Sequence, residues 1–459
     1  MRKESLTNRK LFNACYDKTL QDNEKVVLEG WVRTNRNNGS IGFIEFNDGT
    51  YFKNIQLVYE NSNNNYDFIS HIRYGSAIKV TGLIRLTPEN KQPFEINVLE
   101  IELEGDCAED YPLQKKRHSF EFLRDIAHLR PRANTFNAVF RVRNALAYAI
   151  HKYFQEHGFI YVHTPIITAN DAEGAGQVFK VVTDLKKPDD FFKTNASLTV
   201  SGQLHVESFA LAYRDVYTFG PTFRAENSNT VRHASEFWMI EPEMAFADLS
   251  DNMDTIESFL KYIISYVLEN CKEEMQFFDS MIEKGLLDKL KHVLNSEFKR
   301  MTYTEGIELL LKAKDEGHKF EYNNIFWGMD LQSEHERYLT EKVIKGPMFL
   351  IDYPKEIKAF YMKVNKDNKT VAACDLLVPT VGELVGGSQR EENYEVLKQK
   401  MSQIGNDKGL EWYLDLRKYG GCVHSGFGLG FDRLLMYITG ISNIRDVEPY
   451  PRTPGSLRF

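Results

Sequence analysis

Apolar and polar residues alternate along five short segments between Val26 and residue 104. Asn-Gly, Asp-Gly and Pro-Glu-Asn turn signals separate these segments. Alternation with a period of two is the pattern of a strand with one buried face, and several short strands in succession indicate a small closed sheet. We therefore predict a five-stranded β-barrel over residues 26–104, preceded by an N-terminal extension over residues 1–25.

The pattern changes after a charged segment with two prolines, residues 105–133, which we interpret as a hinge. From Asn134 to Gly158 apolar residues recur at helical spacing, which predicts a long helix. A strand is expected next, over residues 159–168. Its Pro165 favours an edge or interface position, because proline has no backbone N–H to donate.

The remaining residues alternate between helical and strand patterns. Helices are expected at 254–271 and 279–298, within a helical insertion at about 273–328, and strands at 346–354, 357–364, 370–378 and 382–391. A last helix opens in the segment GFGLGFDRLL. Strands, then helices, then strands indicate an α+β domain built on an antiparallel sheet flanked by helices, over residues 134–459.

Composition narrows the class of protein. The chain has 459 residues, of which 42% are hydrophobic and 27% charged, as in soluble globular proteins of two or three domains. The five cysteines form no CxxC pair, so neither a zinc site nor a disulfide framework is indicated. No apolar leader or spanning run is seen, so we expect a cytoplasmic protein without a membrane partner. The net charge of −8 argues against a general polyanion binder but leaves a local nucleic-acid site open.

Two segments carry candidate binding chemistry. In the predicted barrel, Phe43 alternates with apolar residues, and Arg36 and Gln56 lie on neighbouring segments. An exposed aromatic ring stacks on bases, while Arg and Gln contact phosphates and base edges, so these residues suit single-stranded RNA. From this segment alone, a core Phe43 with solvated arginines fits equally well.

The second segment, FRAENSNTVRHASEFWMIEPEMAF at 223–246, has turn composition at its centre and predicts a hairpin. Arg224 and Phe237 would flank one cavity, where a guanidinium suits a phosphate and a flat ring suits a purine. Glu226 and His233 at the loop ends could meet an adenine amine or a polyphosphate. Together these residues indicate a nucleotide site.

The glycines of GFGLGFDRLL allow close approach of a ligand to the backbone, and Arg433 lies one turn into the helix that follows. Taken alone, a helix packed through glycines with Arg433 in a salt bridge is the simpler interpretation. The chain contains neither GxxxxGK[ST] nor GxGxxG, so a P-loop or dinucleotide fold does not account for a nucleotide site.

The strand ending in Pro165 after a long helix, the FRAE…RHASEF hairpin and the GFGLGFDR segment resemble, in this order, the three signature motifs of class II aminoacyl-tRNA synthetases. The barrel resembles the OB-fold anticodon domain of the aspartyl, asparaginyl and lysyl enzymes. The segments FWMIEPEMAF, YPKEIKAFYMK and DLLVPTVGELVGGSQRE resemble the asparaginyl branch. The resemblance extends from about Val26 to Phe459.

This resemblance implies ATP-dependent ligation of L-asparagine to tRNA(Asn) through an aminoacyl-adenylate, with release of pyrophosphate and AMP. By the same resemblance, Arg224 would hold the α-phosphate and the amino-acid carboxylate, Phe237 would stack on adenine, and Glu226 would meet adenine or the tRNA end. His233 and Arg433 would hold the γ-phosphate. Charge stabilisation by Arg224 and Arg433 would then drive catalysis without a general base.

The resemblance further implies Mg²⁺ on Glu383, with Asp375 as second ligand. Related aspartyl enzymes often carry a serine three residues after this glutamate, where this chain has Gly386. Glu173, Ser201 and Gln203 would hold the α-amino group and flank the substrate side chain.

Side-chain selection would rest on two further residues. Arg390 would donate to the side-chain oxygen of the substrate. Val206 replaces a lysine of the aspartyl enzymes, and the adjacent Glu207 is expected to accept a hydrogen bond from the asparagine amide.

In the barrel, Arg36, Phe43 and Gln56 would read the anticodon. The family also implies a homodimer through the helix of residues 134–157 and the Pro165 strand. Two alternatives stay open: an aspartyl enzyme, including one that charges both tRNAs, and a paralogue that binds RNA or makes asparagine from ammonia without aminoacylation. The intact nucleotide residues and the barrel argue against the second.

Overall fold

The computed structural model describes residues 6–62, 65–90, 92–170, 177–187, 189, 191–405 and 409–459. Contacts between residues divide the chain into two compact units, Met1–Asn137 and Ala138–Phe459.

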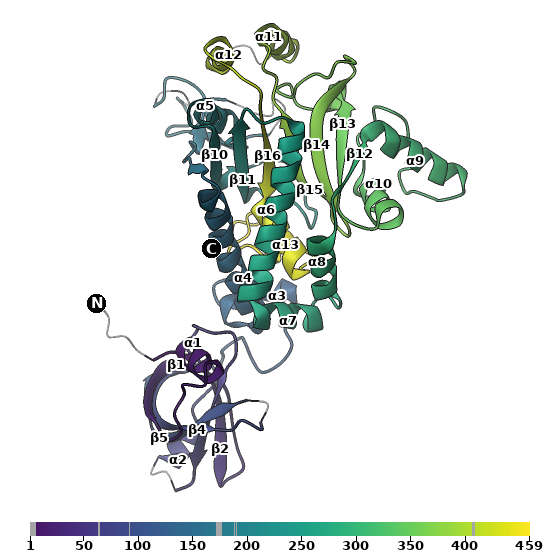
Figure 1. Cartoon of the computed structure of the whole chain (residues 1–459). Helices are drawn as coiled ribbons and strands as arrows, with labels where there is room; N and C mark the ends of the chain where they lie inside the picture. Colours follow the sequence, from purple (N-terminus) through teal and green to yellow (C-terminus); the bar gives the residue numbers. More distant parts are fainter. Residues whose placement is uncertain are drawn as a thin grey trace. The chain divides into compact units, whose positions relative to one another are not determined.

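The first unit is built on a closed barrel of five strands in the order β1-β2-β3-β5-β4 (Figure 1). The strands are β1 Lys25–Asn37, β2 Ile41–Asn47, β3 Ile55–Glu60, β4 Ala77–Leu86 and β5 Phe94–Gly105. Alternate residues such as Ile44, Leu57 and Val80 are fully buried. The predicted five-stranded barrel is therefore confirmed.

The same unit contains the α-helices α1 Asn8–Tyr16, α2 Tyr66–Ser70 and α3 Phe120–Asp125. Helix α1 lies in the N-terminal extension and is capped by Thr7, whose side chain accepts from the backbone N–H of Lys10. It buries Phe12, whose ring lies 4.8 Å from that of Tyr51 and 5.1 Å from that of Phe94. The extension thus contributes to the barrel core.

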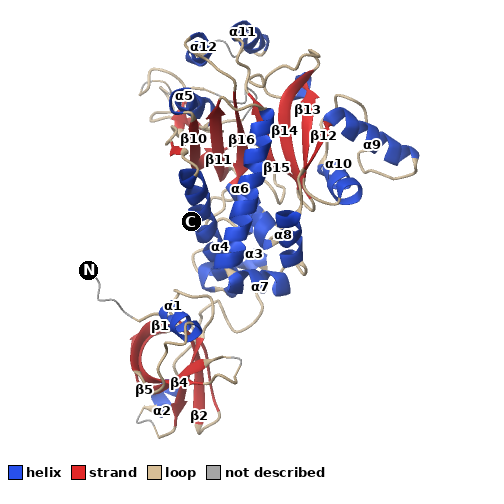
Figure 2. Ribbon diagram, viewed as in Figure 1, coloured by secondary structure: helices blue, strands red, loops and turns tan. Residues whose placement is uncertain are grey.

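The second unit is built on an eight-stranded sheet in the order β12-β13-β14-β15-β16-β11-β10-β6 (Figure 2). The strands are β6 Ile160–Tyr161, β10 Asp215–Phe223, β11 Glu236–Ala245, β12 Lys299–Thr302, β13 Met348–Pro354, β14 Thr370–Val378, β15 Gly382–Gln389 and β16 His424–Gly430. The central pairs are antiparallel, as predicted, whereas β12 and β6 run parallel to their neighbours at the two edges. A small sheet combines β7 Ile167–Thr168, β9 Ala196–Leu198 and β8 Lys180–Val181.

Helices flank this sheet. They are α4 Asn134–Glu156, α5 Gln203–Tyr213, α6 Leu249–Asn270, α7 Lys272–Met281, α8 Leu286–Asn295, α9 Tyr303–Asp315, α10 Ser333–Tyr338, α11 Tyr394–Gln403, α12 Glu411–Lys418 and α13 Phe431–Thr439. Helix α6 runs across β15 and β16, and α5 packs against α12 (Figures 1 and 2). This packing brings segments distant in sequence to the same end of the sheet.

Three predicted elements differ from the structure. The strand expected at 159–168 is split into β6 and β7, with Pro165 outside both, because proline cannot donate to a strand ladder. The helix expected at 279–298 is broken at Gly285, which has a φ of +87°. The strand expected at 357–364 is absent: Ile357 ends the 3-10 turn Lys355–Ile357, and only Met362 and Val364 form isolated bridges, with Arg390 and Val371.

Two further features bear on the expected class of protein. Each of the five cysteines is free, and all lie among the described residues. Within the part of the chain that the structure describes, no helix combines the length and the apolar character that crossing a membrane requires.

Candidate active site

The predicted hairpin is present. Strands β10 and β11 pair antiparallel, with Thr222 opposite Phe237 and Phe223 opposite Glu236. Just beyond the pairing, the backbone N–H of Arg224 donates to the carbonyl of Ser235 at 3.0 Å. The guanidinium carbon of Arg224 lies 5.4 Å from the ring centre of Phe237. The hairpin therefore brings the predicted cation and aromatic ring together.

A single cavity collects the residues predicted to bind the nucleotide. Its empty volume is about 840 Å³, part of it open to solvent. Its lining includes all six of these residues: Arg224, Glu226, His233, Phe237, Glu383 and Arg433. They converge because β16 pairs with both β11 and β15, which places the hairpin, the strand bearing Glu383 and the start of α13 side by side.

Arginines supply the cationic groups of this cavity. Its lining includes Arg224, Arg232 and Arg433. The carboxylate of Asp432 is held elsewhere, because it accepts from the N–H of Trp238 at 3.0 Å and pairs with Arg143. Such a cavity suits a polyanion.

His233 and Arg232 lie in the loop of the hairpin and contribute to the cavity lining. Burial and the neighbouring charge of Arg433 lower the pKa of His233, which favours its neutral imidazole. Arg232 donates to the carbonyl of Val381 at 2.9 Å and to the hydroxyl of Ser333 at 3.1 Å. It thereby ties the hairpin loop to the turn before Glu383.

The carboxylates of the predicted metal ligands Glu383 and Asp375 both lie close to Gly386. A Cβ placed on Gly386 would lie 3.2 Å from Glu383 Oε1 and 3.5 Å from Asp375 Oδ1. Lys358 Nζ donates to Asp375 Oδ2 at 2.6 Å. Desolvation and the charge of Asp375 raise the pKa of Glu383, and a divalent cation would relieve this repulsion.

The residues present therefore fit Mg²⁺, which needs only one or two carboxylates when phosphate and water complete its shell. The described residues contain no group of three or more His, Cys, Asp or Glu placed to hold a metal unaided. Glu336 of α10 accepts from the backbone N–H of Glu383 at 3.0 Å and so fixes the turn that presents this ligand.

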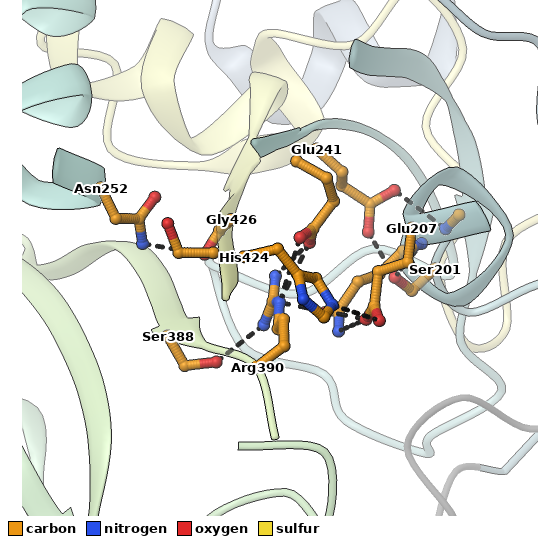
Figure 3. A network of polar contacts seen from close by, with 12 residues as sticks. Ser201, Glu207, Glu241, Asn252, Ser388, Arg390, His424 and Gly426 are labelled. Carbon is orange, nitrogen blue, oxygen red and sulfur yellow. Dashed lines mark hydrogen bonds and ion pairs between the residues drawn. The ribbon is translucent and has the colours of Figure 1, made fainter. Parts of the chain in front are cut away.

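Beyond this cavity lies a buried polar network around Glu207 and Arg390 (Figure 3). Ser201 donates to Glu241, and the N–H of Gly202 donates to the same carboxylate at 2.9 Å. Ser201 and Gln203 thus stand at the start of α5 beside Glu241. Glu173, the third residue predicted to flank the substrate, lies outside the described residues.

Glu207 is fully buried, and its carboxylate is occupied by protein donors. Its Oε1 accepts from Gln203 Nε2 at 3.2 Å and from the Tyr413 hydroxyl at 2.7 Å. Its Oε2 accepts from Arg417 Nη2 at 3.0 Å, contacts His424 Nε2 at 3.2 Å and lies 2.7 Å from the same tyrosine hydroxyl. Four protein groups thus contact this carboxylate, and the hydrogen bond predicted between the substrate amide and Glu207 stays a prediction.

Arg390 occupies the centre of the network. Its Nε and Nη2 donate to Glu243, and its Nη1 donates to Ser388 Oγ at 2.8 Å. These bonds use three of the five N–H groups of a guanidinium. The geometry is thus compatible with the predicted role, because donors remain on the nitrogens that could face a substrate oxygen.

Sequence reasoning missed five residues of the network: Glu241, Glu243, Tyr413, Arg417 and His424. A signal existed for the two glutamates, which alternate in the otherwise apolar strand segment MIEPEMAF. Burial of both glutamates on β11 was therefore foreseeable. No comparable signal marks Tyr413 and Arg417, which lie on a short helix of mixed charge.

The barrel residues predicted to read the anticodon lie on its outer face. Arg36 stands opposite Phe43 across β1 and β2, with its guanidinium carbon 5.4 Å from the ring centre. Gln56 of β3 stands opposite Glu45 and donates to Glu95 at 3.1 Å. Phe43 is half-buried, whereas its neighbours Gly42 and Ile44 are buried, so its ring belongs to the outer face.

Two family models match this chain, one in the barrel and one in the larger part of the chain. A family model described as tRNA synthetases class II (D, K and N) matches residues 120–454, and one described as OB-fold nucleic acid binding domain matches residues 26–104. The chain therefore belongs to the class II tRNA synthetases. Within this class it belongs with the asparagine–tRNA ligases, as the following relatives show.

The chain is 61% identical over 449 residues to the asparagine–tRNA ligase of Clostridium acetobutylicum and 60% identical over 450 residues to that of Clostridium tetani. Each alignment covers 95% of this chain and 96% of the relative. The asparaginyl-tRNA synthetase from Pyrococcus horikoshii complexed with asparaginyl-adenylate is similar in structure, with a TM-score of 0.87, 32% identity and 99% of both chains covered. The predicted resemblance is confirmed.

Proposed function

We propose that the chain activates L-asparagine with ATP in the cavity of Arg224 and Phe237, then transfers the asparaginyl group to tRNA(Asn). The observation that carries this proposal is the position of that cavity. It lies on the paired strands β11, β15 and β16, and β11 and β16 also carry Glu243 and His424 of the buried network around Arg390, which suits a small polar side chain. Membership in the asparagine–tRNA ligases supports the same reaction.

In the activation step, the substrate carboxylate attacks the α-phosphorus of ATP, an acyl–phosphate bond forms and pyrophosphate leaves. Arg224 holds the α-phosphate and the carboxylate, so it stabilises the charge that develops between them. Phe237 stacks on adenine, Glu226 meets adenine or the tRNA end, and His233 and Arg433 hold the γ-phosphate. Placed cations carry this step without a general base.

Glu383 and Asp375 are the residues that would hold Mg²⁺, which neutralises phosphate charge when bound. On the amino-acid side, Ser201 and Gln203 flank the substrate, and Arg390 donates to its side-chain oxygen. Glu173 is proposed to bind the α-amino group. In the barrel, Phe43 stacks on an anticodon base, while Arg36 and Gln56 contact phosphate and base edges.

We further propose a cytoplasmic homodimer through α4 and the segment around Pro165. Strand β6 forms one edge of the large sheet. Tyr148 of α4 and Ile160 and Tyr161 of β6 expose 58%, 44% and 45% of their surfaces, and covering such apolar groups favours association. Sedimentation at micromolar concentration tests it, and a monomer would contradict the proposal.

Pyrophosphate exchange with asparagine and with aspartate, measured side by side, tests the proposed reaction. We expect exchange that depends on asparagine and ATP. Faster exchange with aspartate would assign the chain to the alternative substrate, and no exchange with either would contradict amino-acid activation.

A further inference from the structure

The turn between β14 and β15, residues 379–381, presents the predicted metal ligand Glu383. Val378 pairs with Gly382 across this turn. Thr380 lies in the middle of the turn with a φ of +72°. A β-branched residue is an outlier at positive φ, because its Cβ crowds the backbone there. Such a residue persists only where its surroundings hold the backbone in place.

Two glutamates from outside the paired strands hold this turn. They belong to the segment 333–344, named the brace, which consists of α10 and the π-helical turn that follows it. Glu341 Oε1 accepts from the backbone N–H of Thr380 at 2.9 Å. Glu336 Oε2 accepts from the backbone N–H of Glu383 at 3.0 Å. The brace therefore fixes the turn in its middle and at the ligand itself.

A third contact comes from the hairpin loop of the nucleotide cavity. Arg232 Nη1 donates to the carbonyl of Val381 at 2.9 Å and to the hydroxyl of Ser333, the first residue of α10, at 3.1 Å. The hairpin loop, the turn and the brace thus meet at one guanidinium. Close packing adds to these bonds, because a Cβ placed on Gly382 would lie 2.3 Å from Glu336 Oε2.

The brace is itself anchored to the chain that precedes it. Glu334 accepts from the backbone N–H groups of Glu321 and Tyr322 at 2.8 and 2.6 Å. The buried His335 contacts the carbonyl of Tyr322 through Nε2 at 3.0 Å. These bonds join protein groups alone, so the brace supports the turn without help from a ligand.

The geometry that Mg²⁺ requires gives this support a purpose. Mg²⁺ demands a near-ideal octahedral arrangement of oxygen ligands. Groups that orient a metal ligand change metal affinity by roughly 10-fold to 100-fold when they are removed. A turn free to relax at Thr380 would displace the carboxylate of Glu383. It would thereby weaken the metal while leaving the protein contacts to the nucleotide in place.

We propose that Glu336 and Glu341 are positioning residues, which hold the strained turn and thereby set the affinity of the site for Mg²⁺. This inference rests on the proposed function, in which Glu383 and Asp375 hold the metal. Within the described part of the chain, neither Glu336 nor Glu341 lines the nucleotide cavity. Each acts through the backbone of the turn.

Calorimetric titration with ATP, in Mg²⁺ and in EDTA and without asparagine, tests this role in the absence of turnover. Glu336→Ala removes the acceptor at the ligand, so the gain in ATP affinity from Mg²⁺ should fall by roughly 10-fold. Glu341→Ala removes one exposed hydrogen bond, and the gain should fall by about three-fold. The affinity in EDTA should equal that of the wild type in both variants.

Glu336→Gln and Glu341→Gln keep an acceptor oxygen and should retain most of the gain. Lys342→Ala is the matched control, because Lys342 is the exposed neighbour of Glu341 and its ammonium accepts no hydrogen bond. It should behave as the wild type. The Mg²⁺ concentration for half-maximal pyrophosphate exchange should rise in the two alanine variants in the same order, with an unchanged KM for asparagine.

Equal losses of ATP affinity in Mg²⁺ and in EDTA would show a general structural role and overturn the inference. Wild-type behaviour of both alanine variants, or a glutamine variant as weak as its alanine counterpart, would overturn it as well. Glu341→Ala keeps the test decisive if Glu336→Ala does not fold, as judged by circular dichroism and thermal unfolding. The wild type is measured in the same series, and absence of ATP binding there would count against the proposed function itself.

Discussion

The nucleotide cavity and the buried network around Glu207 share the sheet formed by β15, β16, β11 and β10, yet their side chains are held in different ways. In the cavity, Arg224 and Phe237 face a space open to solvent. In the network, Arg390 and Glu207 are almost completely buried and bonded to other protein groups. Charge recognition thus takes two forms within one active site.

This difference has a physical reason. ATP brings its own charge and metal, so the cavity needs cations that the nucleotide can reach. Asparagine and aspartate have nearly the same shape, so their discrimination requires donors and acceptors fixed before the substrate arrives. Variants in the two regions should therefore divide into those that lose activity alone and those that lose stability as well.

The largest effect is expected from Arg390→Met. This change leaves Glu243 buried without its partner, which typically costs about 3 to 5 kcal/mol of stability, and it removes the donor for the substrate oxygen. The free energy of unfolding, measured with denaturant, should fall by this amount, and asparagine-dependent exchange should be lost. The matched control is Arg390→Met with Glu243→Leu, which should recover most of the stability and none of the activity. Wild-type stability in the single variant would contradict the proposed difference between the buried network and the nucleotide cavity.

Arg224→Ala should lose activity without losing the fold. Removing one preorganised donor to developing charge costs roughly 100-fold to 1000-fold in rate, whereas a side chain that faces a cavity contributes about 0.5 kcal/mol or less to stability. Pyrophosphate exchange and thermal unfolding measure the two quantities. Exchange near the wild-type rate would remove Arg224 from the reaction.

Phe43→Ala provides a reference outside both regions. Loss of one base stack should weaken tRNA charging by about 1 to 3 kcal/mol and leave asparagine-dependent exchange unchanged. Charging assays with the tRNA transcript measure the first, and exchange without tRNA measures the second. A parallel fall in both activities would show that the barrel residue influences the active site.

The last prediction concerns stability alone, at Lys400 of α11, whose Nζ donates to the backbone carbonyl of Met362 at 2.6 Å. Burial lowers the pKa of Lys400 to about 8, while an unfolded chain keeps the ordinary value of about 10.4. Between these values the unfolded state binds the additional proton, so the stability of the wild type rises with pH. The unfolding free energy of the wild type, relative to that of Lys400→Met, should therefore increase from pH 8 to above pH 10. A difference independent of pH would contradict the lowered pKa.

Much of the nucleotide cavity could be predicted because its residues lie in short, ordered segments. The hairpin at 223–246 contributes Arg224 and Phe237, and one glycine-rich strand and helix contribute Arg433. The barrel was predictable for a related reason, since its alternation depends on local burial alone. Local patterns of this kind are visible in a single sequence.

The network around Glu207 could not be predicted in the same way. Its partners Tyr413 and Arg417 come from a helix more than 200 residues further along the chain. The periodicity of a single segment does not indicate which charged residues of distant segments are buried together. The direct contact of Glu207 with the substrate amide stays a prediction. Only the packing of α12 against α5 reveals which protein groups contact its carboxylate.

Gly426 gives this active site a constraint of a different kind. A Cβ at this position would collide with the carboxylate of Glu243, and the carbonyl of the same residue accepts from Asn252 Nδ2 at 2.9 Å (Figure 3). Every amino acid that a point mutation of a glycine codon can introduce carries a Cβ. Substitution of Gly426 is therefore not a route by which laboratory evolution can change the amino-acid substrate, and the first substitutions must occur at other positions of the pocket.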